Sequence, residues 1–459
     1  MTTIVSTEFI KPSSATPPHL KTYNLSVYDQ LIPSTFNPLV IFYPNSGIYH
    51  NPHDQIHDLK KSLSHILTKY YPFAGRHAKF APTCVDCNDL GAEFIEASID
   101  GTLLDFLQNS QHEDLDRLFP HGQTWNSSKC SSGHVLQSDT VIVLAVQVNR
   151  FTCEGLALAV SLSHKIADAY SLVRFLHDWA KMSHGFSKNK TGEVPTEPCF
   201  LSFESTNINF SGFSLELSND CVTRSFVFPN AKIHQLKLKV SAMSVGSGQH
   251  ITNPTRVEAV TWLLYKCAVE ATTKSKLDSF SPTYMSLPIN LRDKMIKQLP
   301  ENCIGNFVTG LEVHTRNEME MKPEMLIGEI RNQKMKIHCI KDIETVFASL
   351  LITSSSNHLE NRQRKLDNAY VYTSLCGSSI WMKGYKCFLS EDIHINLAGV
   401  ERRITPRIRL ENLKGNNITL FRDKVIVSTP SDSTWFGHRH NLGGYLNLNT
   451  HVADATFRI

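Results

Sequence analysis

The amino-acid sequence predicts an α/β fold of two domains, in which mixed β-sheets are flanked by helices. The chain has 459 residues, whereas one domain usually spans about 100–200 residues. Apolar, β-branched runs typical of strands and amphipathic patterns typical of helices occur in both halves of the chain. A polar, irregular stretch over residues 183–220 separates the two halves. We therefore expect an N-terminal domain at 1–182, a crossover linker at 183–220 and a C-terminal domain at 221–459.

The composition narrows the class of protein. Hydrophobic residues make up 41% of the chain and charged residues 19%, which is enough apolar material for a core and argues against disorder. The formal net charge is +3, which is too small for a protein that wraps nucleic acid. The chain has no run of about 18 apolar residues, and its N-terminus lacks a signal-peptide pattern. We expect a cytoplasmic monomer that binds neither nucleic acid nor membrane.

The eleven cysteines are scattered along the chain, and such an odd, sparse set favours reduced thiols. One C-x-x-C pair is formed by Cys84 and Cys87. A zinc site would need a second cysteine pair or two histidines at ligand spacing, and neither is evident nearby. The pattern therefore favours a protein without a bound metal.

The N-terminal half carries two helical patterns. In Ile56–Tyr70, apolar residues recur every three to four positions, and Pro72 ends the pattern. A second helix is expected from Ala169 to Met182, with an apolar stripe that includes Phe175 and Trp179.

Strands are expected at three places in the same half. Ala92–Ala97 reads as a short strand after a turn. Thr140–Phe151 is rich in β-branched residues. Leu156–Ser163 is almost continuously apolar, which predicts a strand buried on both faces.

The C-terminal half contains a helical pattern over Thr255–Glu270 and a strand pattern over Thr283–Ile289. Residues 322–351 are expected to be helical, in one or two pieces. The tail differs, because from Trp381 onward Lys and Arg number 11 against 7 Asp and Glu, whereas the rest of the chain has 35 against 36. This tail shows short alternating runs, such as Ile418–Val427, and no long helical stripe.

A histidine and an aspartate four positions apart, His164 and Asp168, stand between the strand Leu156–Ser163 and the helix that follows it. Only His164 lies at the exit of an apolar strand, where a buried scaffold delivers a side chain into a cleft. The spacing alone is weak evidence, because three more His-x-x-x-Asp pairs lie in polar surroundings typical of the surface: His50/Asp54, His112/Asp116 and His338/Asp342.

The imidazole of a histidine has a pKa near ~6.5, so His164 is able to take a proton from a hydroxyl or amine that attacks an activated carbonyl. The alternative is a buried structural histidine, and the pattern does not separate the two. Asp168 either orients a catalytic group or caps the helix that begins at Ala169, and the spacing favours the cap. No G-x-S-x-G motif is present, which disfavours a hydrolase, although activation of water by His164 stays an alternative.

Eight segments of residues 1–375 form an ordered set of motifs. The central one is Ser163-His164-Lys165-Ile166-Ala167-Asp168. The others are Leu25–Leu31, Tyr71–Arg76, Asp86–Asp89, Gln147–Phe151, Pro254–Val260, Asn290–Arg292 and Leu299–Asn306. Each motif is weak evidence by itself, but in order and spacing the set resembles the plant BAHD acyltransferases. Within that family, the sequence is most similar to the alkaloid-acetylating branch.

This resemblance implies two chloramphenicol-acetyltransferase-like domains with a channel at their interface. It also implies that acyl-CoA, in this branch acetyl-CoA, donates its acyl group to a hydroxyl of a small molecule such as an alkaloid or terpenoid, with no permanently bound cofactor. His164 would be the general base, and Asp168 would turn away from the substrate and pair with Arg292. The hydroxyl of Thr373 would help to stabilise the oxyanion.

The sequence departs from the family pattern at three places. Ala169 replaces a glycine, and Leu375 replaces the tryptophan of a Thr-Ser-Trp segment. After Cys376 the Asp-Phe-Gly-Trp-Gly motif, which braces the CoA channel in the family, is absent, and no resemblance is found from about Gly377. The alternative is therefore a non-catalytic or defective member with a disrupted CoA channel, in which missing closing strands open a sheet edge.

Overall fold

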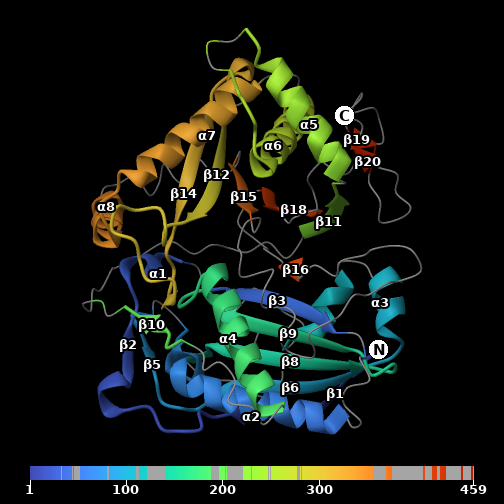
Figure 1. Ribbon diagram of the computed structural model, residues 1–459, viewed down its shortest axis with the longest axis vertical. Coiled ribbons are helices and arrows are strands. Elements are labelled where there is room, and N and C mark those ends of the chain that lie inside the picture. The colour runs from blue at the N-terminus through green and yellow to red at the C-terminus, as the bar shows by residue number, and fades with distance from the viewer. Residues whose placement is uncertain are drawn as a thin grey trace. The chain divides into compact units, whose positions relative to one another are not determined.

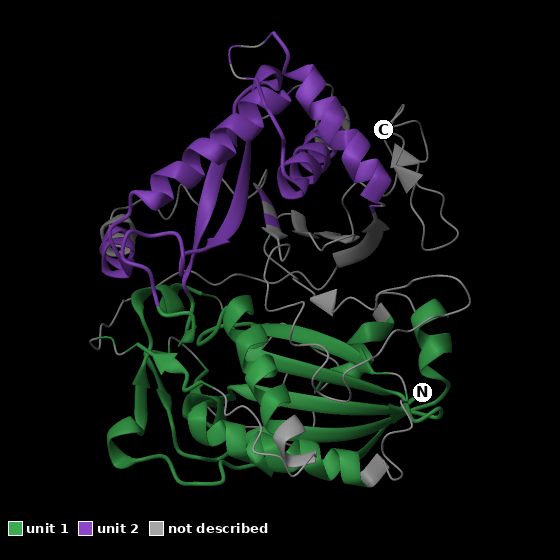
Figure 2. Ribbon diagram, viewed as in Figure 1, with its two compact units in different colours: residues 1–214, 300–306, 378–409 green, residues 215–299, 307–377, 410–459 purple. Residues whose placement is uncertain are grey.

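The chain forms two compact units, seen in the computed structural model in Figure 2. Unit 1 comprises Met1–Ser214, Pro300–Asn306 and Ser378–Arg409, and unit 2 comprises Leu215–Leu299, Phe307–Gly377 and Leu410–Ile459. The division after Ser214 falls within the expected linker, most of which lies outside the described residues. The structure describes residues 1–32, 34–43, 45, 52–79, 82–109, 113–120, 140–187, 196–201, 203, 221–228, 230–246, 248, 250–275, 280, 282–355, 369–374, 407–408, 416–420, 424–430, 446–447 and 456–457.

The main sheet of unit 1 is mixed, as the sequence predicted, with the strand order β1-β6-β8-β9-β3-β16. β6 and β8 are parallel, and the other neighbouring strands are antiparallel. Every residue of β9 is buried, because it is a central strand between β8 and β3. The strands are β1 (Thr2–Ile10), β6 (Ala92–Ile99), β8 (Leu144–Phe151), β9 (Leu156–Ser163), β3 (Phe36–Tyr43) and β16 (Arg407–Ile408).

Two long helices, α2 (Pro52–Lys69) and α4 (Ala169–Ser187), lie side by side across one face of this sheet (Figure 1). The indole N–H of Trp179 in α4 donates a hydrogen bond of 3.0 Å to the Ser62 hydroxyl in α2, and both side chains are buried. α2 begins at Pro52, earlier than expected, because proline suits the first turn of a helix, where its missing N–H is not needed. Unit 1 also contains two short helices, α1 (Val27–Leu31) and α3 (Leu103–Asn109).

The strand expected at Thr140–Phe151 is divided between two sheets. Its first part is β7 (Thr140–Ile142), which belongs to a four-stranded sheet of order β2-β5-β4-β7, and its second part is β8. The break falls at Val143, and a run of β-branched residues does not reveal such a change of partner. The other strands of this small sheet are β2 (Thr22–Asn24), β5 (Cys84–Asp86) and β4 (Arg76–Ala78). A separate parallel pair joins β10 (Cys199–Phe200) to β13 (Cys303–Ile304).

Unit 2 contains a second six-stranded mixed sheet, with the order β11-β18-β17-β15-β12-β14. β15 is parallel to both β12 and β17, and the other neighbours are antiparallel. The strands are β11 (Cys221–Val227), β18 (Lys424–Pro430), β17 (Asn416–Leu420), β15 (Ala369–Ser374), β12 (Thr283–Asn290) and β14 (Val308–Thr315). A short pair, β19 (Leu446–Asn447) and β20 (Thr456–Phe457), follows in the tail.

The tail therefore supplies two strands to this sheet. β17 pairs with β15 from Tyr370↔Asn416 to Ser374↔Leu420, and β18 joins β17 to β11. The open sheet edge expected under the defective-member alternative is wrong for these strands. Motif matching missed them because backbone hydrogen bonds, which any alternating run of residues is able to form, make the pairing.

Four helices are described in unit 2: α5 (Asn230–Met243), α6 (Arg256–Ser275), α7 (Pro323–His338) and α8 (Ile343–Ser355). α7 and α8 are the two pieces that the sequence allowed for residues 322–351. α6 is anchored by two buried side chains. The Trp262 indole donates to the Met321 carbonyl (3.0 Å), and the Tyr265 hydroxyl donates to Thr315 (3.0 Å).

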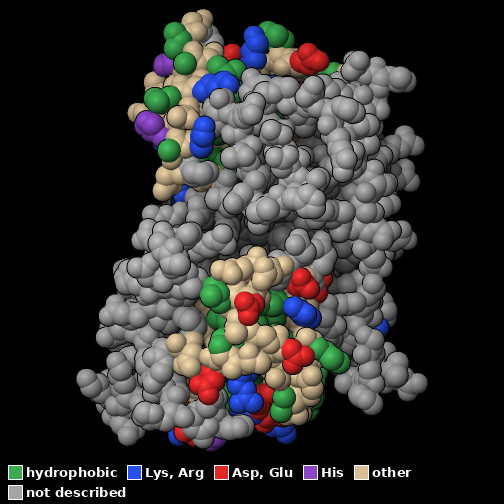
Figure 3. Space-filling view, turned by 90° about the vertical axis from the view of Figure 1, so that its right-hand side faces the viewer, with side chains coloured by type: hydrophobic (Ala, Val, Ile, Leu, Met, Phe, Trp, Pro, Cys, Tyr) green, Lys and Arg blue, Asp and Glu red, His purple; other side chains and the backbone are tan. Residues whose placement is uncertain are grey.

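Charge is mixed on the described part of the face that Figure 3 shows. On the face shown in Figure 3, acidic and basic side chains lie among one another, in agreement with the small net charge. Across the part of the chain that the structure describes, no helix is both long and apolar enough to cross a membrane.

Candidate active site

His164 lies in the turn between β9 and α4, on a backbone that hydrogen bonds to Val143 and Thr35 hold in place. The N–H of Ser163, the last residue of β9, donates to the Val143 carbonyl (2.8 Å). The N–H of His164 donates to the Thr35 carbonyl (2.8 Å), just before β3. The side chain of His164 is half-buried, so a rigid scaffold presents a partly accessible imidazole.

One hydrogen bond determines which nitrogen of His164 carries the proton. Nδ1 of His164 lies 3.0 Å from Oδ1 of Asn306. The amide nitrogen of Asn306 points the other way, because it donates to Asp29 Oδ1 (2.8 Å) and to the His164 carbonyl (2.7 Å). Oδ1 of Asn306 is therefore the acceptor, and Nδ1 of His164 is the donor. The neutral ring then has an unprotonated Nε2 that is able to accept a proton.

The environment of His164 also keeps its ring neutral. Burial lowers the pKa of His164 below its ordinary value, and the charge of Asp168 and the bond to Asn306 oppose this only in part. Burial disfavours the charged form of an imidazole. The unprotonated base is therefore the main form of His164 at neutral pH.

Asp29 anchors the amide of Asn306 from the first turn of α1. Both side chains are buried, and the Asp29 carboxylate also accepts from the backbone N–H (2.9 Å) and the hydroxyl (2.7 Å) of Ser26. Burial raises the pKa of Asp29 to about 6, although the hydrogen bonds from Asn306 and Ser26 act in the opposite direction. The carboxylate is thus mostly ionised at neutral pH and holds Asn306 in a single orientation.

Lys165 adds a cation to this buried polar group. Its ammonium donates to the Gln30 carbonyl (3.0 Å), and burial lowers the pKa of Lys165 to about 8, against the opposing charge of Asp29. The positive charge of Lys165 therefore offsets part of the negative charge of Asp29, and both residues belong to unit 1.

Asp168 caps α4, as its position before Ala169 predicted. Its buried carboxylate accepts from the Ser171 N–H (2.8 Å), and its carbonyl accepts from the Leu172 N–H (3.0 Å). The Asp168 N–H donates to the Gly305 carbonyl (3.3 Å). Gly305 has a φ of 150°, which side-chain-bearing residues rarely adopt. The cap therefore ties α4 to the same short segment that carries Asn306.

Arg292 and Thr373 belong to unit 2. The buried Arg292 guanidinium donates to Asn290 Oδ1 (3.1 Å) and stacks over the Phe307 ring, 4.8 Å from its centroid. Thr373 is in β15 with its backbone paired to Thr419, and its side chain lies outside the described residues. The pairing of Arg292 with Asp168 and the role of Thr373 stay predictions.

A second histidine lies directly behind the turn. The Ser163 hydroxyl donates to Nε2 of His77 (2.9 Å), because Nδ1 of His77 donates to the Ala78 carbonyl (2.8 Å). Both side chains are buried. Burial lowers the pKa of His77 to about 4, helped by the charge of Lys165 and opposed by the bond to Ala78. His77 is therefore a neutral support for the residue that precedes His164.

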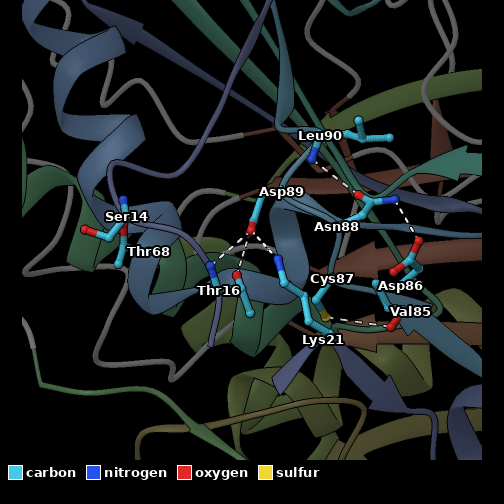
Figure 4. A network of polar contacts seen from close by, with 10 residues as sticks. All are labelled: Ser14, Thr16, Lys21, Thr68, Val85, Asp86, Cys87, Asn88, Asp89 and Leu90. Atoms are coloured by element: carbon cyan, nitrogen blue, oxygen red, sulfur yellow. Dashed lines mark hydrogen bonds and ion pairs between the residues drawn. The ribbon is translucent and has the colours of Figure 1, made fainter. Parts of the chain in front are cut away.

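The C-x-x-C segment has a structural role in the described fold (Figure 4). The carboxylate of Asp89 accepts from the backbone N–H (3.0 Å) and hydroxyl (2.5 Å) of Thr16 and from the Lys21 ammonium (2.6 Å). The thiol of Cys87 is buried and donates to the Val85 carbonyl (3.7 Å). Within the described residues, no group of three or more His, Cys, Asp and Glu side chains is placed to hold a metal ion.

Sequence reasoning identified His164 and Asp168 but assigned no role to Asn306, Asp29 or His77. Asn306 and Asp29 were present in the quoted motifs, Leu299–Asn306 and Leu25–Leu31. Their presence in these motifs could have indicated a role, because a buried polar side chain needs a hydrogen-bond partner. The partner is 142 positions away from Asn306, so only the fold reveals it.

Comparisons with known proteins agree with this architecture. A family described as "Transferase family" matches residues 1–383. Akuammiline synthase 1 of Alstonia scholaris is 37% identical over 333 residues, which cover 72% of this chain and 73% of that protein. The 17,18-epoxy-17-hydroxycur-19-ene N-malonyltransferase of Strychnos nux-vomica is 32% identical over 383 residues, or 82% of this chain and 77% of that protein.

The crystal structure of vinorine synthase superposes with a TM-score of 0.72 at 26% identity, covering 95% of this chain and 96% of that one. The family match ends at residue 383, close to the point where the motifs stop. The match over most of the sequence, the named relatives and the shared fold lead to one conclusion: the chain belongs to the BAHD acyltransferases, a family of acyl-CoA-dependent enzymes.

Proposed function

We propose that this acyltransferase moves an acetyl group from acetyl-CoA to a hydroxyl of an alkaloid or terpenoid, with His164 as the general base. The observation that carries the proposal is the bond from Nδ1 of His164 to Asn306. It leaves Nε2 as the proton acceptor. The lowered pKa of His164 supports the same role, because a general base must be unprotonated when the substrate binds.

The proposed reaction has two proton transfers. Nε2 of His164 takes the hydroxyl proton while the hydroxyl oxygen bonds to the thioester carbonyl carbon. The resulting tetrahedral oxyanion is stabilised by hydrogen-bond donors, among which we propose the Thr373 hydroxyl. The C–S bond then breaks, the ester is released, and the CoA thiolate takes the proton from the His164 imidazolium.

The other predicted residues act through structure in this proposal. Asp168 holds the first turn of α4, and its expected pairing with Arg292 would orient the two rather than touch the substrate. We also propose that the enzyme acts as a cytosolic monomer and needs no resident cofactor.

The substrate class is proposed from the relatives' names. Akuammiline synthase 1 supports an alkaloid acceptor, and the N-malonyltransferase shows that one relative transfers a malonyl group to nitrogen. A screen should therefore pair acetyl-CoA and malonyl-CoA with alkaloid and terpenoid alcohols and with amines. Mass spectrometry of the products identifies both the acyl group and the acceptor class.

The decisive variant is His164→Ala, with exposed His57→Ala as the matched control. Loss of the base should lower kcat by about 10²–10⁴-fold, while the far-UV spectrum and thermal midpoint stay those of the wild type. His57→Ala should retain full activity. Near wild-type turnover by His164→Ala would refute the proposed base.

Two further measurements separate the alternatives. Stabilisation against heat by millimolar CoA is expected if the CoA channel is intact, and its absence would support the non-catalytic alternative. Release of free acid without acceptor, as fast as transfer, would support the hydrolase alternative in which His164 activates water.

A further inference from the structure

Two cysteines far apart in the sequence face each other in unit 1. Cys199 of β10 and Cys303 of β13 are direct partners in a parallel strand pair. Their sulfur atoms are 3.6 Å apart. The Cys199 N–H donates to the Asn302 carbonyl (2.9 Å), so the backbone on both sides of the pair is held in register.

This geometry is close to that of a disulfide. Paired strands lie about 4.7–4.9 Å apart, and Cα atoms joined by a disulfide are about 4.4–6.8 Å apart. The sulfur atoms of Cys199 and Cys303 must approach from 3.6 Å to about 2.05 Å. Side-chain rotation is enough for this, because the backbone spacing is already within range.

We propose that Cys199 and Cys303 are a redox site that forms an intramolecular disulfide by exchange with a small oxidised disulfide such as oxidised glutathione. The Cys199 thiolate attacks one glutathione sulfur, forms a mixed disulfide and releases a glutathione thiolate. The Cys303 thiolate then attacks the Cys199 sulfur and displaces the second glutathione. Two protein thiols thus lose two electrons and two protons, and one glutathione disulfide becomes two glutathione thiols.

Exposure sets the order of these steps. Cys199 is half-buried and open to a small reagent, whereas Cys303 is fully buried and acts as the resolving thiol. In the C-x-x-C pair, the buried Cys87 thiol instead donates to the Val85 carbonyl (3.7 Å).

The disulfide would fasten the segment that supports the proposed base. Cys303 precedes Gly305, which bonds to Asp168, and Asn306, which bonds to His164. The side-chain amide of Asn302 also donates to the Glu197 carbonyl (2.5 Å), so residues 197–200 already brace this segment. The effect on catalysis rests on the proposed function, whereas disulfide formation itself does not.

The test is to equilibrate the full-length protein in glutathione buffers of increasing oxidised fraction, block free thiols with an alkylating reagent, and map peptides by mass spectrometry. We expect a Cys199–Cys303 cross-linked peptide that dithiothreitol removes. The oxidised protein should melt at least about 2 °C higher, because the bond closes a long loop. Cys199→Ser and Cys303→Ser should each abolish the cross-link, and Cys153→Ser, which removes an exposed thiol, should retain it.

Absence of this peptide in fully oxidised buffer, or its persistence in Cys199→Ser, would overturn the proposal. The same mapping on His164→Ala separates the two hypotheses, because that variant should form the disulfide whatever its activity. If the disulfide forms and wild-type activity does not respond to it, the redox site stands and its link to the proposed base is rejected.

Discussion

The side-chain amide of Asn306 controls which nitrogen of His164 is protonated, because its own hydrogen bonds fix its orientation. Its nitrogen has two acceptors, the Asp29 carboxylate and the His164 carbonyl, so its oxygen faces the imidazole. Asn306→Ala removes the acceptor for Nδ1 and one of the buried donors to the Asp29 carboxylate, which keeps its bonds from Ser26. We expect kcat to fall by about 10–10²-fold with a smaller change in KM, because proton transfer depends on the ring's tautomer.

The matched control is Asn302→Ala, in the same segment, whose amide bonds to the Glu197 carbonyl instead. It should leave the pH profile of kcat unchanged, whereas Asn306→Ala should alter it. Equal losses in the two variants would mean that Asn306 only holds the segment and does not act through His164.

His77 predicts a specific pH dependence of stability. Its pKa of about 4 in the folded chain lies below the ordinary value of 6.5, so the unfolded chain binds a proton that the folded chain does not. The free energy of unfolding should therefore be highest above pH ~6.5 and fall as the pH drops toward 4, by at most about 3 kcal/mol from this group. His77→Gln, which does not titrate, should reduce this loss.

Urea unfolding at pH 7.5, 6 and 5 measures the effect, with exposed His57→Gln as the control. The wild type and His57→Gln should lose stability in parallel, and His77→Gln should lose less. A slope for His77→Gln equal to that of the wild type would show that another group causes the acid sensitivity.

At the scale of single elements, apolar patterns in the sequence located several helices and strands correctly. β9 matches its predicted range Leu156–Ser163, and residues 322–351 resolve into α7 and α8. The division of the strand at Val143 was not predicted, because the pattern of apolar residues indicates which side chains are buried but not which strand pairs with which. Asp168 was identified as the cap of α4 because capping depends only on residues within one turn.

The strands β17 and β18 make the tail part of the sheet in unit 2. Deleting residues 416–459 would remove both and leave β15 and β11 without these partners. Exposed strand edges promote aggregation, so this truncated chain should elute from a size-exclusion column mainly in the void volume. Deleting only residues 431–459, which keeps β17 and β18, is the matched control and should stay largely monomeric. Identical behaviour of the two chains would show that the pairing adds nothing to folding.

At the scale of the whole molecule, the small net charge conceals a basic tail and a nearly neutral body. The family match covers the body and ends at residue 383. The tail nevertheless provides strands, because a sheet accepts any segment that is able to extend and make backbone hydrogen bonds. The absence of the Asp-Phe-Gly-Trp-Gly motif therefore does not leave this sheet without β17 and β18.

The sequence by itself determined the α/β class, the family, several of the helices and strands, and the position of His164 at a strand exit. These depend on local period, on residues within one turn, or on motifs in a fixed order. Only the tertiary structure decided that Asn306 sets the tautomer of His164, that Asp29 and His77 support the turn, and that Cys199 meets Cys303. The partners in these contacts are 86 to 277 positions apart, and a contact over such a distance exists only once the sheets have brought the two segments together.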